Sequence, residues 1–162
     1  MSQNPDRLTE IPRSDDFVSC YGCGPKNEHG ARIHFALDEA ARRVEATWAP
    51  PGHFAGYRRM VHGGVIATML DEAMGWALWG LARRVGVTRE MVVRFHRPIV
   101  IEKPYRILGR IDRMDDAEAT VLAEVRDGRG RLAADGTGEF TFISLDKVRD
   151  HRRPERPETD DP

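Results

Sequence analysis

Two groups of polar residues interrupt an otherwise apolar stretch over residues 61–84, and they are the first candidates for chemistry. The stretch opens with His62, Gly63 and Gly64, and an acidic pair follows about two turns later. Backbone N–H groups at a helix N-terminus are unpaired and carry partial positive charge, and glycine lets a ligand approach them. These N–H groups can form an oxyanion hole for a polarised carbonyl, or the glycines can simply make a sharp turn into the helix.

Asp71 is the stronger candidate of the acidic pair. It shares a helical stripe with Thr68 and Gly75, at spacings of three and four residues. A carboxylate there can activate water as a general base or attack directly, and the alternative is a structural ion pair with an arginine. Glu72 points about 100° away and is interpreted as structural. Thr88, after the helix, can hold a water or a thioester, or it is simply a residue that favours strands.

Cys20 and Cys23 form a C-x-x-C spacing followed by a Gly-Pro pair. A metal would need two more ligands, and His29 and His34 are the nearest candidates. A redox pair would need a thioredoxin-like βαβ context, which is absent. We therefore favour buried small residues in a glycine turn and expect neither a metal nor an organic cofactor, with a zinc module as an alternative.

Length and composition are those of one globular domain. The chain has 162 residues, of which 40% are hydrophobic and 31% are charged. The net charge of −1 provides no basic field for nucleic acid or an anionic membrane. The N-terminus shows no secretory signal, and the acidic pair would be costly at mid-bilayer. We expect a cytoplasmic protein without a membrane span.

Alternating apolar residues predict strands on both sides of the long helix. One hairpin precedes it and four strands follow it, over residues 31–37, 44–48, 88–97, 105–111, 119–125 and 131–145. Hairpin-linked strands around a single helix, without βαβ alternation, predict an α+β domain with a largely antiparallel sheet curled around the helix. One sheet cannot surround a helix completely, so we expect a second copy of the chain to cover the rest.

The ends of the chain differ in composition from its middle. Polar residues and two prolines predict a flexible N-terminus over residues 1–16. A single domain is predicted over residues 17–145, and Gly86 is its natural helix stop. Residues 146–162 are charged, contain three prolines and show no periodicity, so that tail is predicted to be disordered.

The helix motif HGGVIATMLDEAMG, together with the strand over residues 88–98, resembles the hotdog-fold acyl-CoA thioesterases of the phenylacetate-pathway (PaaI) type. The turn CYGCGPKN, and Gly56-Tyr57 ahead of the helix, are similar to the N-terminal signature of one branch of that family. The resemblance extends over residues 20–145. It implies a hotdog fold, in which a curved antiparallel sheet wraps one long helix, and dimers with a continuous sheet that often stack into tetramers.

The resemblance also implies roles for individual residues at a dimer interface. Gly63, with Gly64 beside it, would offer backbone N–H groups to the thioester oxygen, and His62 would shape the helix start and help orient the carbonyl. Asp71, acting from the other subunit, would be the base or nucleophile. Thr88 matches a Ser/Thr position that helps to place the lytic water.

The expected activity is hydrolysis of an acyl-CoA thioester to free acid and CoA by a homodimer or homotetramer. The alternatives are a non-catalytic acyl or CoA binder and a hotdog acyl-thioester dehydratase or hydratase. There is one departure from the family, since some relatives carry an Asn six residues before the His and this chain has Gly56 there. Trp76 and Trp79 line or block the acyl tunnel, and the sequence does not decide which.

Overall fold

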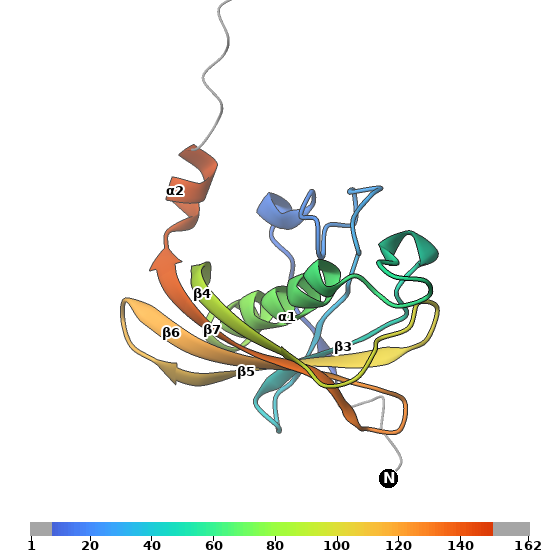
Figure 1. The fold of residues 1–162 in the computed structure, drawn as a ribbon. Coiled ribbons are helices and arrows are strands. Elements are labelled where there is room, and N and C mark those ends of the chain that lie inside the picture. Colours follow the sequence, from blue (N-terminus) through green and yellow to red (C-terminus); the bar gives the residue numbers. More distant parts are fainter. Residues whose placement is uncertain (1–7, 151–162) are drawn as a thin grey trace, which may run out of the picture.

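The computed structural model describes residues 8–150, and its centre is a helix that lies across one face of a curved sheet (Figure 1). Helix α1 (Gly63–Ala77) continues as a π-helical turn, η4 (Leu78–Ala82). Met69 and Met74 on α1 are fully buried, so the apolar stretch is covered as its composition predicts. No helix within residues 8–150 is long and apolar enough to span a membrane.

The sheet has seven strands in the order β1-β2-β3-β5-β6-β7-β4, and every pair is antiparallel. The strands are β1 (Thr9–Glu10), β2 (Ala36–Asp38), β3 (Arg43–Trp48), β4 (Val85–Phe95), β5 (Tyr105–Met114), β6 (Glu118–Arg126) and β7 (Leu132–Ile143). Short helical segments complete the described chain, namely η2 (Asp15–Phe17), η3 (Gly52–Phe54) and α2 (Leu145–Asp150). The predicted α+β architecture is confirmed. Strand β4 lies at one edge of the sheet, directly after the helix in sequence.

Two glycines let α1 lie against the sheet. A Cβ atom at Gly109 on β5 would lie 2.2 Å from the carbonyl oxygen of Ala73. A Cβ atom at Gly138 on β7 would lie 2.6 Å from the sulfur of Met74. Real side chains do not approach so closely, so glycine at both positions sets how near the helix sits to the strands.

The predicted N-terminal hairpin exists, but its first strand is shorter than expected. β2 pairs with β3 only over residues 36–38. Arg32 has a left-handed backbone with φ of 51°, and the N–H of Ile33 donates to the carbonyl of Gly22 at 2.9 Å. The chain before β2 is therefore bonded to the cysteine turn instead of to β3. Ile33 and Phe35 are nevertheless buried, so their apolar pattern reports burial correctly.

The helix stop was predicted at the wrong residue. Arg83, in a left-handed conformation with φ of 54°, ends η4, and its N–H is bonded to carbonyls of that turn. Gly86 lies within β4 opposite Phe142. A Cβ there would come within 3.0 Å of Leu78, so the glycine serves packing between strand and helix.

The structure also differs from the expected domain bounds at both ends. β1 pairs with β2, and Ile11 is only 3% exposed, so residues 9–11 are part of the packed domain. Helix α2 extends past the predicted domain end at residue 145. The rest of the predicted flexible and disordered segments, residues 1–7 and 151–162, lies outside the described residues.

Candidate active site

A pocket of about 190 Å³ lies beside α1 and is lined by two of the predicted catalytic residues, Asp71 and Thr88. Its apolar wall is made by side chains from η2, the central helix with η4, the edge strand β4 and its neighbour β7, namely Phe17, Trp76, Trp79, Val85 and Phe140. Its polar side chains are Cys20, Cys23, Asp71, Glu72 and Thr88. Gly75 opens onto this space, because a Cβ atom there would meet nothing within 4 Å. The two tryptophans therefore line the pocket, which the sequence left undecided.

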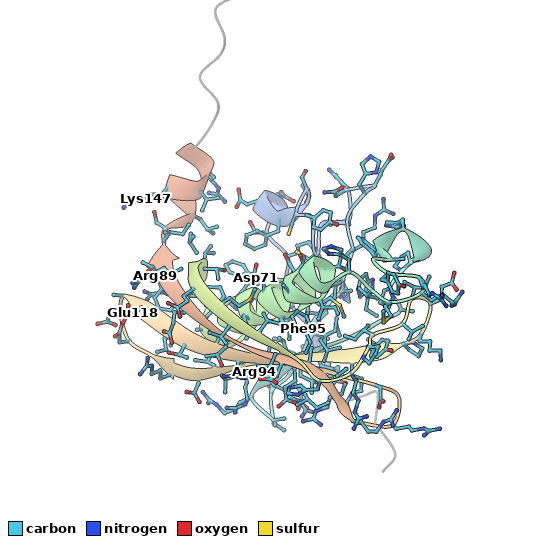
Figure 2. The ribbon with its side chains drawn as sticks, viewed as in Figure 1. Asp71, Arg89, Arg94, Phe95, Glu118 and Lys147 are labelled. Carbon is cyan, nitrogen blue, oxygen red and sulfur yellow. The ribbon has the colours of Figure 1, made fainter. Side chains whose placement is uncertain are left out.

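Asp71 and Thr88 form the central polar contact of the pocket. The Thr88 hydroxyl donates to Asp71 Oδ1 at 2.7 Å, from β4 to α1. In Figure 2, Asp71 lies on the side of the helix that faces β4. No lysine or arginine of residues 8–150 forms an ion pair with Asp71, so the structural ion pair considered from the sequence is absent there. A half-buried carboxylate that keeps one oxygen free of hydrogen bonds to the described residues can accept a proton from water.

A β-bulge in β4 brings Thr88 into this contact. Thr88 pairs with Phe140 and Glu90 pairs with the adjacent Glu139, so Arg89 is the extra residue. Side chains alternate between the faces of a strand, and one extra residue reverses the alternation. Thr88 and Met91 therefore both face the helix, although a regular strand would place them on opposite faces. Arg89 instead pairs with Glu118 on the surface (Figure 2).

The N-terminus of α1 forms the second part of the predicted site. His62 caps the helix, and its Nδ1 accepts the N–H of Gly64 at 3.0 Å. Because Nδ1 accepts, the proton of the neutral ring is inferred to be on Nε2, where it can be donated. The N–H of Gly63 has no acceptor among the described residues, and Gly63 is exposed. Of the two expected oxyanion donors, Gly63 is thus free and Gly64 is occupied by the cap.

Gly56, the departure from the family pattern, packs directly against the capping histidine. A Cβ atom at Gly56 would lie 2.9 Å from the Cα of His62. An asparagine cannot occupy this position without moving the loop, because the neighbouring atom is backbone. At this position the chain therefore has a close approach of two backbone segments and no side chain that could contact a carbonyl.

The two parts of the site are not brought together within one chain. Gly63 and Asp71 are eight residues apart on one helix, which is about 12 Å along its axis. Gly63 instead lies near Phe95, whose ring would be 3.7 Å from a Cβ at that glycine. Phe95 is 56% exposed on β4 (Figure 2), and both it and Gly63 are open to a ligand or another chain.

Glu72, which was interpreted as structural, lies in the pocket with both cysteines. The thiol of Cys20 donates to Glu72 Oε1 at 3.0 Å. Burial, and then the hydrogen bond with Cys20, raise the pKa of Glu72 to about 8. The Cys23 thiol and nearby backbone N–H groups lower the pKa of Cys20, while the hydrogen bond to Cys20 and burial raise that of Cys23.

Sequence reasoning missed this cluster because its members are far apart in the chain. The histidines suggested as companions of the cysteines, His29 and His34, are exposed and lie outside the cluster. Phe17 and Phe140 were also missed, since apolar residues carry no signal for a pocket. The available signals were the acidic pair itself and the C-x-x-C spacing, and only their combination in space makes them informative.

The sequence profile of the Thioesterase superfamily matches residues 59–134, which contain α1, β4, β5, β6 and the first residues of β7. Among solved structures, the chain is similar to a thioesterase superfamily protein with a TM-score of 0.71 and 23% identity, over 82% of this chain and 69% of that one. It is also similar to the PaaI protein of the phenylacetic acid degradation operon of Escherichia coli. That match has a TM-score of 0.63 and 16% identity, over 70% and 81% of the two chains.

A third similar structure is a hypothetical thioesterase protein of Streptococcus pneumoniae solved with coenzyme A. Its TM-score is 0.60 at 18% identity, over 63% of this chain and 79% of that one. These structural likenesses show that the chain has the hotdog fold. The profile match agrees with the predicted resemblance to thioesterases over residues 59–134.

Proposed function

We propose that this chain is an acyl-CoA thioesterase that hydrolyses an acyl-CoA thioester to a free acid and CoA. The observation that carries the proposal is the 2.7 Å hydrogen bond from Thr88 to Asp71 in a pocket with an aromatic wall. The Thioesterase superfamily match and the similarity to a protein solved with coenzyme A support the substrate class. Hydrolysis needs no metal or organic cofactor, because a thioester is activated enough for water assisted by a carboxylate.

Asp71 is the proposed base or nucleophile. Its Oδ1 is held by the Thr88 hydroxyl, which fixes the carboxylate and leaves Oδ2 to act. As a base, Asp71 takes a proton from the water that attacks the thioester carbon, and the CoA thiolate leaves. As a nucleophile, it attacks the thioester carbon and displaces the CoA thiolate to form an acyl anhydride, and water then cleaves the anhydride to the free acid and the Asp71 carboxylate. In either route Thr88 positions Asp71, and in the first it also helps to place the lytic water.

The proposed oxyanion hole is the start of α1. Gly63 supplies a free backbone N–H at the positive end of the helix dipole. Gly64 contributes indirectly, since its N–H holds the imidazole of His62 in place. His62 can then donate its Nε2–H to the same carbonyl, which compensates for the missing asparagine at Gly56.

A homodimer, alone or within a homotetramer, is the proposed active form. The oxyanion donor and the carboxylate are about 12 Å apart along one helix, so one chain cannot place both on one thioester. β4 is an edge strand that exposes Val87 and Val92, at 50% and 43%. Exposed apolar edge strands favour pairing with another chain. Pairing of two β4 strands would continue the sheet and bring each Gly63 toward the Asp71 of the other copy.

The test is turnover of an acyl-CoA panel by the purified full chain, followed as release of the CoA thiol. We expect hydrolysis of at least one aliphatic or aryl acyl-CoA, and a large loss in Asp71→Asn. Absence of thiol release from the whole panel would overturn the proposal. Hydration of crotonyl-CoA without thiol release would point to a hydratase, and CoA binding without turnover would point to a binding protein.

A further inference from the structure

A compact set of possible metal ligands lies in the wall of the pocket. It consists of the side chains of Cys20, Cys23 and Glu72. Two thiols and one carboxylate place their ligand atoms within 4.8 Å of one another. In a tetrahedral zinc site, with Zn–S of about 2.3 Å and Zn–O of about 2.0–2.2 Å, ligand atoms lie roughly 3.5–3.8 Å apart. The 3.0 Å contact from the Cys20 sulfur to Glu72 needs less than an ångström of opening to admit such an ion.

The turn that carries the cysteines is already held in a defined shape. The N–H of Gly24 donates to the carbonyl of Cys20 at 2.9 Å, and Ile33 closes the turn from the following segment. Backbone N–H groups of Gly22 and Cys23 lie against the Cys20 sulfur. Such N–H groups orient a thiolate ligand and stabilise its charge. The loop therefore needs little ordering to bind a metal.

Glycine between the cysteines is required for the carboxylate to reach them. A Cβ atom at Gly22 would lie 2.2 Å from Cγ of Glu72, well inside any allowed contact. Glu72 thus passes over the backbone of the turn to meet the thiols. Helix α1 and the cysteine turn are therefore in contact at the possible ligand atoms themselves.

Glu72 is a half-buried carboxylate without a cationic partner within residues 8–150. The thiol of Cys20 donates a hydrogen bond to its Oε1 at 3.0 Å. Arg13 instead donates to the carbonyl of Cys23 and lies over the ring of Trp76. An ionised carboxylate removed from water without an opposite charge is unfavourable, so such a group is protonated or takes a cation, and a bound cation supplies the opposite charge.

We propose that Cys20, Cys23 and Glu72 bind one divalent ion of the zinc class in the wall of this pocket. Thiolate ligands select zinc over magnesium or calcium, which prefer oxygen. Binding releases the thiol protons and ties the loop of residues 20–24 to α1. Three protein ligands leave a fourth position for water or another donor, an arrangement common in sites that are open to solvent.

The test is metal binding by the full chain, stripped with a chelator and kept reduced. Co²⁺ is titrated first, because cobalt bound to thiolates gives a charge-transfer absorption, and Zn²⁺ is then added to displace it. We expect one ion per chain and a Zn²⁺-dependent rise in Tm. Cys20→Ser should weaken the charge-transfer band, and Glu72→Gln should lower Zn²⁺ affinity at least ~10-fold, since even outer-shell changes cost that much.

Two matched controls separate this site from general metal uptake. His29→Ala removes an exposed histidine near the cysteine turn, and Asp71→Asn removes the carboxylate next to Glu72. Neither residue belongs to the proposed metal site, so both variants should bind Zn²⁺ as tightly as the unchanged chain. The proposal is overturned if the reduced chain binds no ion. It is equally overturned if Glu72→Gln and Cys20→Ser, checked for folding by circular dichroism, bind as before. These readouts do not involve thioester turnover, so this proposal and the proposed function fail independently.

Discussion

Two adjacent carboxylates on one helix have entirely different surroundings in this protein. Asp71 faces β4 and accepts a hydrogen bond from a threonine 17 residues later in the chain. Glu72 faces the N-terminal loop and meets a cysteine 52 residues earlier. On the strand side the acid meets a hydroxyl, while on the loop side the acid meets thiols. Residues next to each other on a helix can thus belong to separate chemistries.

The two sites also differ in the number of chains that they require. The set of Cys20, Cys23 and Glu72 is complete within one chain. The proposed hydrolytic site needs Asp71 from one chain and Gly63 from another, because the helix holds them about 12 Å apart. Breaking the proposed dimer should therefore abolish thioester hydrolysis and leave metal binding intact. This is the largest effect that we expect.

Replacing Val87 and Val92 together with lysine should produce a monomer without thioesterase activity. Like charges on the exposed edge strand oppose pairing of two β4 strands. Light scattering and thiol release measure the two effects, and thiol release should fall to background while Co²⁺ binding persists. Val92→Thr, which keeps the shape of the side chain, is the control. A fully active monomer would show that one chain contains the whole site.

Asp71→Asn should reduce kcat by ~10²-fold or more, the usual loss when an acid–base group is removed. Asparagine keeps the size of the side chain and can still contact Thr88, so folding should be retained. Steady-state kinetics on the best acyl-CoA, with circular dichroism for folding, provide the measurement. A rate equal to that of the unchanged chain would move the catalytic role to another residue.

Thr88→Val should reduce kcat by about 10-fold, since a hydrogen bond to a charged group contributes roughly 1.5–3 kcal/mol. The valine preserves the volume and the strand preference but cannot orient Asp71. Thr88→Ser restores the hydroxyl and should recover most of the rate. If Thr88→Val keeps the rate and Thr88→Ser loses it, the methyl packing of the threonine matters and not its hydrogen bond.

Gly22→Ala tests the packing of Glu72 against the cysteine turn. Its expected effect is the smallest of the four and is on the free energy of unfolding. The added Cβ would lie 2.2 Å from Glu72, so we expect a loss of roughly 1–3 kcal/mol, as for other overpacked sites. Urea unfolding in the presence of chelator measures it. Gly128→Ala is the matched control, because a Cβ there meets nothing within 4 Å. Equal stability of both variants would contradict the close approach of Glu72 to the turn.

Much of the fold could be predicted from periodicity alone. The apolar stretch of residues 61–84 contains α1 and η4, and the four strands predicted after it correspond to β4, β5, β6 and β7. Such patterns report which side chains are buried. They do not report hydrogen-bond partners, so the segment before β2 was predicted as strand although its backbone bonds to the cysteine turn.

The site could be predicted only in part. Asp71 and Thr88 were recognised separately, and their contact depends on the bulge at Arg89, which reverses the faces of β4. Strict alternation would have placed Thr88 away from the helix. Glu72 was set aside because it points away from Asp71, and that direction is what brings it to the cysteines.

The sequence by itself determined a buried helix that starts with His62, Gly63 and Gly64 and carries an acid two turns later. Helical rise is constant, so the spacing of Gly63 and Asp71 follows directly from residue numbers. Only the tertiary structure decided what each acid meets. Thr88 reaches Asp71 through a bulge, and Cys20 reaches Glu72 because Gly22 lets the side chain pass. Contacts between distant segments depend on the packing of the whole chain, and local patterns do not encode them.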